Sequence, residues 1–234
     1  MSSVVVSVLP DLPTVPLADG TVAELLDRLG GVPPGRVRLV PAPYTATEED
    51  VLAADAHSDR LCELIDGTLV EKTMGSYESG VAAAMVYFLK AFVRRAGLGV
   101  VLGADGFLRI MPRQVRIPDA SFISRDRLPA GQLPKSAIWE VVPDLAVEVL
   151  SADNTAREMQ RKLEDYFAAG VRLVWHIDPR SRTATSYTAA DQGTPVGEGG
   201  ALDGGAVLPG FRLMLRDLFA EADGVGTSAG PQRP

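Results

Sequence analysis

The sequence predicts a folded domain of mixed helices and strands. Two segments, at about 77–95 and 155–170, carry apolar residues at helical spacing, and a series of short strand-like segments lies between them. A further pair of strand-like segments follows the second helix pattern. With 234 residues, of which 46% are hydrophobic and 23% charged, the chain is long enough to bury one sizeable core.

Composition narrows the classes of function. The single cysteine, Cys62, excludes an internal disulfide framework, and two histidines argue against a histidine-rich metal site, so we expect any metal to be held by oxygens. The net charge of −7 argues against unspecific nucleic-acid binding by the whole surface. The start lacks the pattern of a signal peptide and no apolar stretch reaches the length of a membrane span, which favours a cytoplasmic location and no membrane partner.

The ends of the chain are predicted to lie outside the main domain. Residues 1–45 hold Pro/Gly-rich segments around a short helical pattern, TVAELLDRLG, and are interpreted as an N-terminal extension. The main domain is assigned to residues 46–220 and begins with a second short helix in EEDVLAAD. Residues 221–234 are predicted to be a disordered tail.

The first half of the domain predicts a hairpin, a helix and a β-rich centre. In RLCELIDGTLVEK, alternating residues flank Asp66 and Gly67, a pair suited to a tight turn. A helix is expected from about Tyr77 to Arg95, with Gly97 as its stop. Strands are predicted at about 99–103, 107–111, 115–123 and 145–150, with a loop over 128–143 between the last two.

The second half begins with the clearest helix signal in the chain. In TAREMQRKLEDYFAAG, Thr155 and Glu158 fit a capping box, and Gly170 closes the helix. The apolar stripe of this helix comprises Met159, Leu163, Tyr166 and Phe167. VRLVWHID and TATSYT then predict paired strands, and LPGFRLMLRDLF predicts a last short strand and helix after a glycine-rich segment.

Two acids in strand-like sequence are the main candidates for a functional site. Asp119 in RIPDASFIS and Glu148 in PDLAVEVLS each lie among apolar neighbours, where an unpaired carboxylate would be costly. If their strands are adjacent, at about 4.8 Å, the two carboxylates can jointly hold Mg²⁺ or Mn²⁺ with waters and a substrate phosphate. Asp144 lies roughly 13 Å from Glu148 along the strand, too far for both to ligate one ion.

Basic and polar residues near these acids have two interpretations each. Lys162 lies at the border of the apolar stripe and can lean towards the sheet, or it can cover apolar surface with its stem. The arginines between Arg109 and Arg127 can form a local basic patch or simply keep strand ends soluble. A structural role explains Gln160 and the lone strand histidine, His176, better than a role in a site.

The ordered set of motifs resembles the Uma-two family of putative restriction endonucleases, within the PD-(D/E)XK nuclease superfamily. The set comprises ELIDG, an amphipathic helix, VRIPDASFIS, PDLAVEVLS, the pattern of Lys162, Tyr166 and AGV, then VWHIDP and LPGF. The resemblance covers about residues 45–220. It implies an α/β fold with a restriction-endonuclease-like core, in which helices flank a central mixed β-sheet.

The resemblance also implies roles for individual residues. Asp119 and Glu148 correspond to the metal ligands, with the carbonyl of Val149 as a further candidate ligand, and Lys162 corresponds to the catalytic lysine. Glu63, the family's hairpin acid, either faces the metal from the side or is an exposed hairpin acid. Tyr166 packs in the core, and its hydroxyl is also placed to steady Lys162.

Two departures from the usual pattern affect this assignment. The superfamily's lysine stands two residues after the glutamate, where this chain has Leu150, so the resemblance implies that Lys162 takes that role. Relatives often have a histidine in the first helix, near the place of Ser79 in SYESG. Loss of that polar group is expected to weaken or retune a site.

Three hypotheses about function follow. The first is a metal-dependent endonuclease that hydrolyses phosphodiester bonds of DNA with Mg²⁺ or Mn²⁺. The second is a catalytically weak or inactive nuclease-fold module that binds nucleic acid or a protein partner. The third is a metal phosphoesterase for small substrates. Because many nucleases that cut both strands dimerise, a homodimer is an option, although no interface follows from the sequence.

Overall fold

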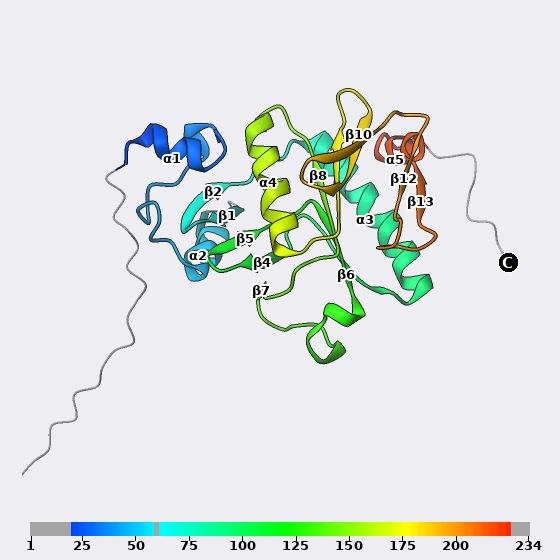
Figure 1. Cartoon of the computed structure of the whole chain (residues 1–234), viewed down its shortest axis with the longest axis horizontal. Helices are drawn as coiled ribbons and strands as arrows, with labels where there is room; N and C mark the ends of the chain where they lie inside the picture. Colours follow the sequence, from blue (N-terminus) through cyan, green and yellow to red (C-terminus); the bar gives the residue numbers. More distant parts are fainter. Residues whose placement is uncertain (1–19, 59–60, 226–234) are drawn as a thin grey trace, which may run out of the picture.

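The computed structural model describes residues 20–58 and 61–225 and has an α/β architecture built on two mixed sheets (Figure 1). The six-stranded sheet has the order β11-β10-β9-β8-β6-β3 and comprises β3 (Gly99–Leu102), β6 (Ala120–Ser124), β8 (Leu145–Val149), β9 (Leu173–Asp178), β10 (Thr183–Ala189) and β11 (Gln192–Val196). The five-stranded sheet has the order β2-β1-β5-β4-β7 and comprises β1 (Cys62–Ile65), β2 (Thr68–Glu71), β4 (Phe107–Met111), β5 (Gln114–Arg116) and β7 (Ile138–Trp139). The predicted fold class is confirmed, with two large sheets in place of one.

Two long helices cover opposite faces of the six-stranded sheet. Helix α3 (Ser76–Ala96) packs with α5 (Leu215–Ala222) on the face that carries Phe122, Val147 and Trp175. Helix α4 (Ala156–Ala169) covers the other face, where Ala146 and Val174 lie (Figure 1). Because side chains alternate along a strand, Glu148 and His176 also point towards α4.

The helix ends follow the predicted signals. Thr155 accepts the backbone N–H of Glu158, whose side chain accepts the N–H of Thr155, so the capping box at the start of α4 is confirmed. Gly97 and Gly170 end α3 and α4 in the left-handed conformation, with φ of 66° and 97°. The caps set where α4 begins and ends, and the packing of Leu163 and Tyr166 against the sheet sets the direction of its side chains.

The predicted hairpin is present as β1 and β2. Its two turn residues, Asp66 and Gly67, have φ of 51° and 76°, as a two-residue hairpin turn requires. Helix α2 (Glu48–Ser58) precedes the hairpin, as expected. The hairpin joins the central part of the chain through β5, which pairs with β1.

The predicted single strand over 115–123 is wrong, because the chain changes sheets within it. β5 belongs to the five-stranded sheet and β6 to the six-stranded sheet. Pro118, which has no N–H to give to a ladder, lies at the crossing. Asp119 therefore stands in the connection between the two sheets rather than inside a strand, although its N–H still bonds the carbonyl of Val147 at 2.9 Å.

The N-terminal segment from residue 20 packs on the hairpin and on α4. Helix α1 (Val22–Arg28), in the predicted TVAELLDRLG pattern, is followed by a short 3-10 helix, η1 (Pro34–Arg36). Leu25, Leu29 and Val32 bury against Ile65 and Val70 of the hairpin. This part of the proposed extension is thus integral to the folded core, while residues 1–19 lie outside the described residues.

The C-terminal part contains more strand than the sequence predicts. β11 and β12 (Ala201–Asp203) form in the glycine-rich segment, where the sequence analysis named no strand, and β12 pairs with β13 (Arg212–Met214). β11 is an exposed edge strand that tolerates Pro195, so it lacks the apolar alternation by which strands are predicted. Helix α5 extends to Ala222, and residues 226–234 of the predicted tail lie outside the described residues.

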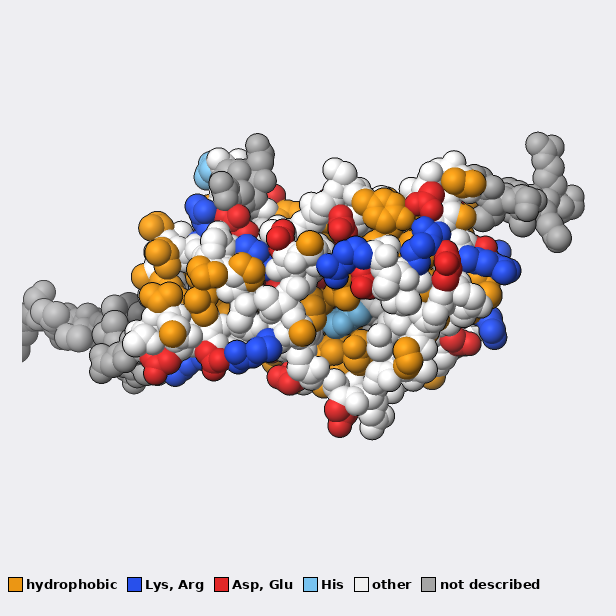
Figure 2. All heavy atoms as spheres, turned by 90° about the horizontal axis from the view of Figure 1, so that it is seen from above, with side chains coloured by type: hydrophobic (Ala, Val, Ile, Leu, Met, Phe, Trp, Pro, Cys, Tyr) orange, Lys and Arg blue, Asp and Glu red, His pale blue; other side chains and the backbone are white. Residues whose placement is uncertain are grey.

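The remaining elements and the surface add two observations. The predicted loop over 128–143 contains β7 and a short 3-10 helix, η3 (Pro129–Gly131), and another, η2 (Arg125–Arg127), precedes it. On the face seen in Figure 2, basic and acidic side chains are interspersed. Among the described helices, none combines the length and the apolar character needed to cross a membrane.

Candidate active site

Asp119 and Glu148 come together on the face of the six-stranded sheet that α4 covers. β6 and β8 are adjacent and antiparallel, with Ala120 opposite Val147, as the two-carboxylate hypothesis requires. One oxygen of Asp119, Oδ2, accepts the backbone N–H of Val149 at 2.6 Å. The two side chains are only 2% and 4% exposed, so both acids lie in the protein interior.

Glu148 is held by two side chains of α4. Tyr166 donates its hydroxyl to Oε1 at 2.6 Å, and Lys162 Nζ lies 3.1 Å from Oε2. Lys162 is 4% exposed, so it turns inwards from the border of the apolar stripe, and the alternative of a surface lysine is excluded. The tyrosine hydroxyl contacts the carboxylate rather than the lysine that the sequence analysis assigned to it.

Glu63, on β1, is the third carboxylate of this cluster. Its side chain is buried, accepts the N–H of Ile117 at 3.1 Å, and pairs with Arg116 NH1 at 2.8 Å and Lys162 Nζ at 3.2 Å. The alternative of an exposed hairpin acid is therefore wrong. Arg116 also pairs with Asp165 of α4, which ties the five-stranded sheet to the helix.

Lys72, which the sequence analysis did not single out, neutralises Asp119. Its Nζ lies 2.7 Å from Asp119 Oδ1, 2.6 Å from the carbonyl oxygen of Ile117 and 3.3 Å from that of Ala104. The side chain is only 6% exposed. The available signal was its position after β2, where it continues the alternation of the buried residues Thr68 and Val70.

The buried acids of the cluster have basic partners, yet the surroundings of Glu148 disfavour its charged form. Burial raises the pKa of Glu148, and although Lys162 lowers it, the nearby charges of Asp119 and Glu63 raise it further. Glu63 shows the opposite shift: burial raises its pKa, but Lys162 and Arg116 together lower it to about 2. Burial lowers the pKa of Lys162, but Glu148 and Glu63 outweigh burial and raise it. Lys162 thus stays charged between two acids.

The chemistry of the donors fits a hard divalent cation with two protein carboxylates. Asp119 Oδ1 is buried and meets Lys72 as an ion pair without an aligned hydrogen bond, so this oxygen is the least satisfied of the cluster. Within the described residues, no group of three or more His, Cys, Asp or Glu side chains is arranged to hold a metal. Mg²⁺ commonly takes one or two carboxylates and completes its shell with water and substrate phosphates. A cation at Asp119 would replace the ammonium of Lys72.

Comparison with known proteins assigns the chain to a family. A family model described as "Putative restriction endonuclease", Uma2, matches residues 48–216, well over half of the chain. The chain belongs to the Uma2 family. A crystal structure from Anabaena variabilis, described as that of a putative nuclease, has a similar fold, with a TM-score of 0.63 and 19% identity over 70% of this chain and 93% of that one. Among curated proteins, none is significantly similar to this chain.

The Uma2 chain places the other sequence candidates away from the cluster or in structural roles. Ser79 is exposed on α3, and Gln160 is exposed on α4 and bonds Glu164. Leu150 directly follows β8, and its N–H bonds the carbonyl of Ile177. The position that the resemblance gives to the usual lysine is thus occupied by an apolar side chain in this protein.

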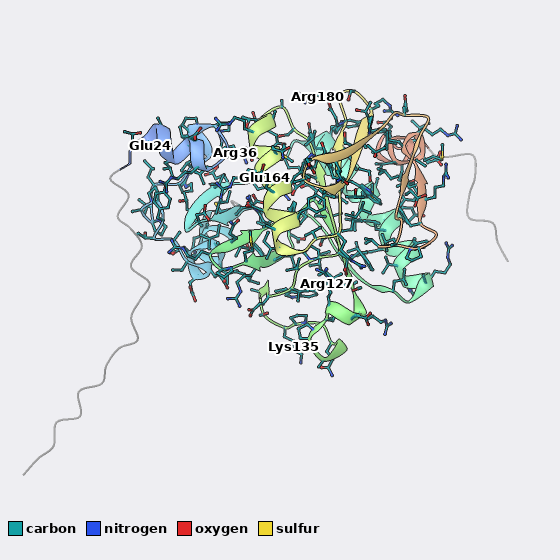
Figure 3. The ribbon with its side chains drawn as sticks, viewed as in Figure 1. Glu24, Arg36, Arg127, Lys135, Glu164 and Arg180 are labelled. Atoms are coloured by element: carbon teal, nitrogen blue, oxygen red, sulfur yellow. The ribbon has the colours of Figure 1, made fainter. Side chains whose placement is uncertain are left out.

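The arginines of the predicted basic patch mostly contact their own fold. Arg109 pairs with Glu48 and Glu140, and Arg113 donates to the carbonyl of Tyr44. Arg125 donates to the carbonyl of Gly97, and Arg127 pairs with Asp144 (Figure 3). The structural interpretation of these arginines is thus favoured in the Uma2 chain over a free basic surface.

Proposed function

We propose that this Uma2 protein is a DNA endonuclease that depends on a divalent cation, Mg²⁺ or Mn²⁺. The observation that supports this function best is the meeting of Glu148 of β8 with Asp119, which directly precedes the adjacent strand β6, while Lys162 lies against Glu148. Family membership supports nuclease activity in general, and the two carboxylates support metal dependence.

Asp119 and Glu148 would hold the cation, with the carbonyl of Val149 as the predicted third protein ligand. When bound, a divalent cation polarises the phosphate and lowers the pKa of a water. The N–H of Val149 already orients Asp119, and the hydroxyl of Tyr166 already orients Glu148. These two bonds leave the opposite oxygens, which now contact lysines, as the atoms available to a cation.

Lys162 is the proposed catalytic lysine. In hydrolysis a water oxygen bonds to phosphorus while the ester P–O bond breaks, and negative charge grows on the phosphoryl oxygens. A permanently charged ammonium beside Glu148 is suited to orienting the water or stabilising that charge. Glu63 holds Lys162 in place from the other side at 3.2 Å.

The test is cleavage of plasmid and single-stranded DNA in the presence of Mg²⁺ or Mn²⁺. We expect the wild type to cut and Asp119→Ala to lose cutting while it remains folded by circular dichroism. Glu164→Gln is the matched control, because Glu164 is an exposed acid on the outer side of α4 (Figure 3). A metal-loaded wild type that cuts no form of DNA contradicts the proposal.

A second candidate function is nucleic-acid binding without cleavage. The observation that favours it is that the three carboxylates already have cationic partners in Lys72, Lys162 and Arg116. Calorimetry separates the two functions. Absence of Mg²⁺ and Mn²⁺ binding together with retained DNA binding supports the second function, whereas metal binding that disappears in Asp119→Ala supports the first. Cleavage of mononucleotide esters but no polymer would instead indicate a phosphoesterase for small substrates.

A further inference from the structure

A cavity of about 340 Å³ opens between the first turns of α4 and the strands β9 and β10. Its walls combine apolar side chains such as Met159 with the polar groups of Asn154, Gln160 and Arg180. The volume falls within the range of about 300–1,000 Å³ that small-molecule sites occupy. On the face seen in Figure 2, a histidine side chain lies among hydrophobic side chains.

His176 is the residue of this cavity that lacks a structural explanation. It interrupts the buried strand LVWHID and is only 5% exposed. Its Nε2 atom is buried and has no hydrogen-bond partner within the described residues. Buried polar atoms are nearly always paired, and an unpaired one costs free energy. The buried, unpaired Nε2 of His176 therefore points to a hydrogen-bond partner from outside the protein.

The cavity adjoins the proposed catalytic site. His176 is the register partner of Glu148 on the neighbouring parallel strand, so the two side chains stand next to each other on the face under α4. Leu163, the neighbour of Lys162, forms part of the cavity wall. Burial, aided by the charge of Lys162, lowers the pKa of His176 to about 3, and a neutral imidazole has one donor and one acceptor nitrogen.

An aromatic wall indicates what kind of ligand suits the cavity. The ring of Tyr187 lies 5.0 Å from that of His176, tilted by 60°, and both rings line the cavity. Aromatic side chains provide surfaces on which nucleobases stack, and amide side chains such as those of Asn154 and Gln160 form hydrogen bonds with base edges. Arg180 adds a positive charge at the wall, partly balanced by Asp178 at 3.3 Å.

We propose that this cavity is a nucleotide subsite, in which His176 and Tyr187 receive the base of the nucleotide next to the phosphate that is cut. The identity of the ligand rests on the proposed nuclease function. His176 supplies a hydrogen bond to the base, and Tyr187 supplies a stacking surface. The subsite positions a single unpaired nucleotide beside Glu148, so the protein favours single-stranded or locally opened substrate.

The test is to measure the binding of each of the four deoxynucleoside 5′-monophosphates, in the presence of EDTA, by calorimetry or ligand-observed NMR. At least one is expected to bind the wild type, and to bind His176→Leu and Tyr187→Leu about tenfold more weakly or worse. Tyr87→Leu is the matched control, because Tyr87 is exposed on α3. Inorganic phosphate is the control ligand, and equal affinity for it would reduce the subsite to an anion site and overturn the proposal.

Stability separates a ligand role for His176 from a structural one. Because leucine removes an unpaired buried nitrogen, His176→Leu is expected to melt at the same temperature as the wild type or higher while it loses nucleotide binding. A variant that is as stable as the wild type and binds nucleotides equally well overturns the proposal. So does a wild type that binds none of the four.

Cleavage is scored independently of this binding. Asp119→Ala is expected to abolish cleavage yet keep nucleotide binding within about threefold, because Asp119 is outside the cavity wall and, unlike Glu148, is not the register partner of His176. If the wild type binds nucleotides through His176 but cuts no DNA, the subsite stands and the proposed nuclease function fails. If the wild type cuts DNA but binds none of the four nucleotides, the proposed nuclease function stands and the subsite proposal fails.

Discussion

Two buried acids at opposite ends of β8 show how differently one strand uses the same chemical group. Asp144, just before the strand, is 1% exposed and is surrounded by donors: Arg127 Nε at 2.8 Å, Arg172 at 2.8 Å and the N–H of Ser124 at 2.7 Å. Glu148 is also buried, but the charges of two further acids, Asp119 and Glu63, raise its pKa.

The difference lies in what each acid does for the fold. Each partner of Asp144 is a donor that joins a loop or a strand end to β8, so Asp144 stabilises the native state. Glu148 has one ammonium, shared with Glu63, and a tyrosine hydroxyl. A buried acid whose neighbours are acids is held at a cost in stability, which is typical of functional sites.

The largest expected effect comes from amide substitution at the two ends. Glu148→Gln is expected to lower the rate of DNA cleavage by about a thousandfold or more, since a metal ligand is lost, and to leave the free energy of unfolding equal or higher. Asp144→Asn is expected to lower the free energy of unfolding, because its arginines lose a charged acceptor. The loss is limited to roughly 1–3 kcal/mol because those arginines are partly exposed, and the cleavage rate per folded molecule is expected to change little. Urea unfolding measures the free energy of unfolding of both variants, and a DNA cleavage assay measures their rates. The comparison fails if Glu148→Gln is the less stable variant and Asp144→Asn the less active one.

Part of the candidate site could be predicted from the sequence. The apolar surroundings of Asp119 and Glu148 predicted a two-acid site, the capping box and Gly170 predicted the helix that carries Lys162, and the resemblance gave that lysine its role. These signals are local, because each depends on residues within a few positions of one another. The adjacency of β6 and β8 remained conditional until the structure supplied it.

Lys72 and the split of the 115–123 segment escaped prediction for a common reason. β5 pairs with β1, whereas β6 pairs with β8, so the break at Pro118 depends on partners distant in the sequence. Lys72 binds Asp119 and the carbonyl of Ile117, which meet only because the chain crosses between sheets there. Propensity and periodicity carry no information about such a crossing.

The second effect concerns Glu63 and acid stability. Its folded pKa is lowered to about 2 from 4.5, so its stabilisation is fully present above pH 4.5 and is lost as the pH falls towards 2. A shift of one pKa unit corresponds to about 1.4 kcal/mol, so the contribution of Glu63 is a few kcal/mol. Glu63→Gln is expected to be less stable than wild type at neutral pH and to lose less stability between pH 4.5 and 2. Unfolding followed by circular dichroism, with Glu164→Gln as control, measures this. If the free energy of unfolding falls with pH equally in wild type and Glu63→Gln, ionised Glu63 does not stabilise the fold.

The smallest effect distinguishes the two lysines of the cluster. Lys72→Met removes the ammonium from Asp119 Oδ1 and leaves the N–H of Val149 on Oδ2. A carboxylate freed from its internal cation is a better ligand, so we expect Mg²⁺ to bind about tenfold more tightly and to raise the melting temperature of the variant more than that of the wild type. The variant in EDTA is expected to melt below the wild type, because a buried carboxylate has lost its partner.

Lys162→Met provides the matched comparison. If Lys162 acts on the phosphate while Lys72 only neutralises Asp119, both variants gain Mg²⁺ affinity, but only Lys162→Met loses cleavage, by about a hundredfold. Equal losses of cleavage in the two variants would give Lys72 a share in the chemistry. A melting temperature of Lys72→Met that does not respond to Mg²⁺ would mean that the oxygen next to Lys72 is not the one that a cation takes, and the metal site would then have to be placed on Glu148 alone.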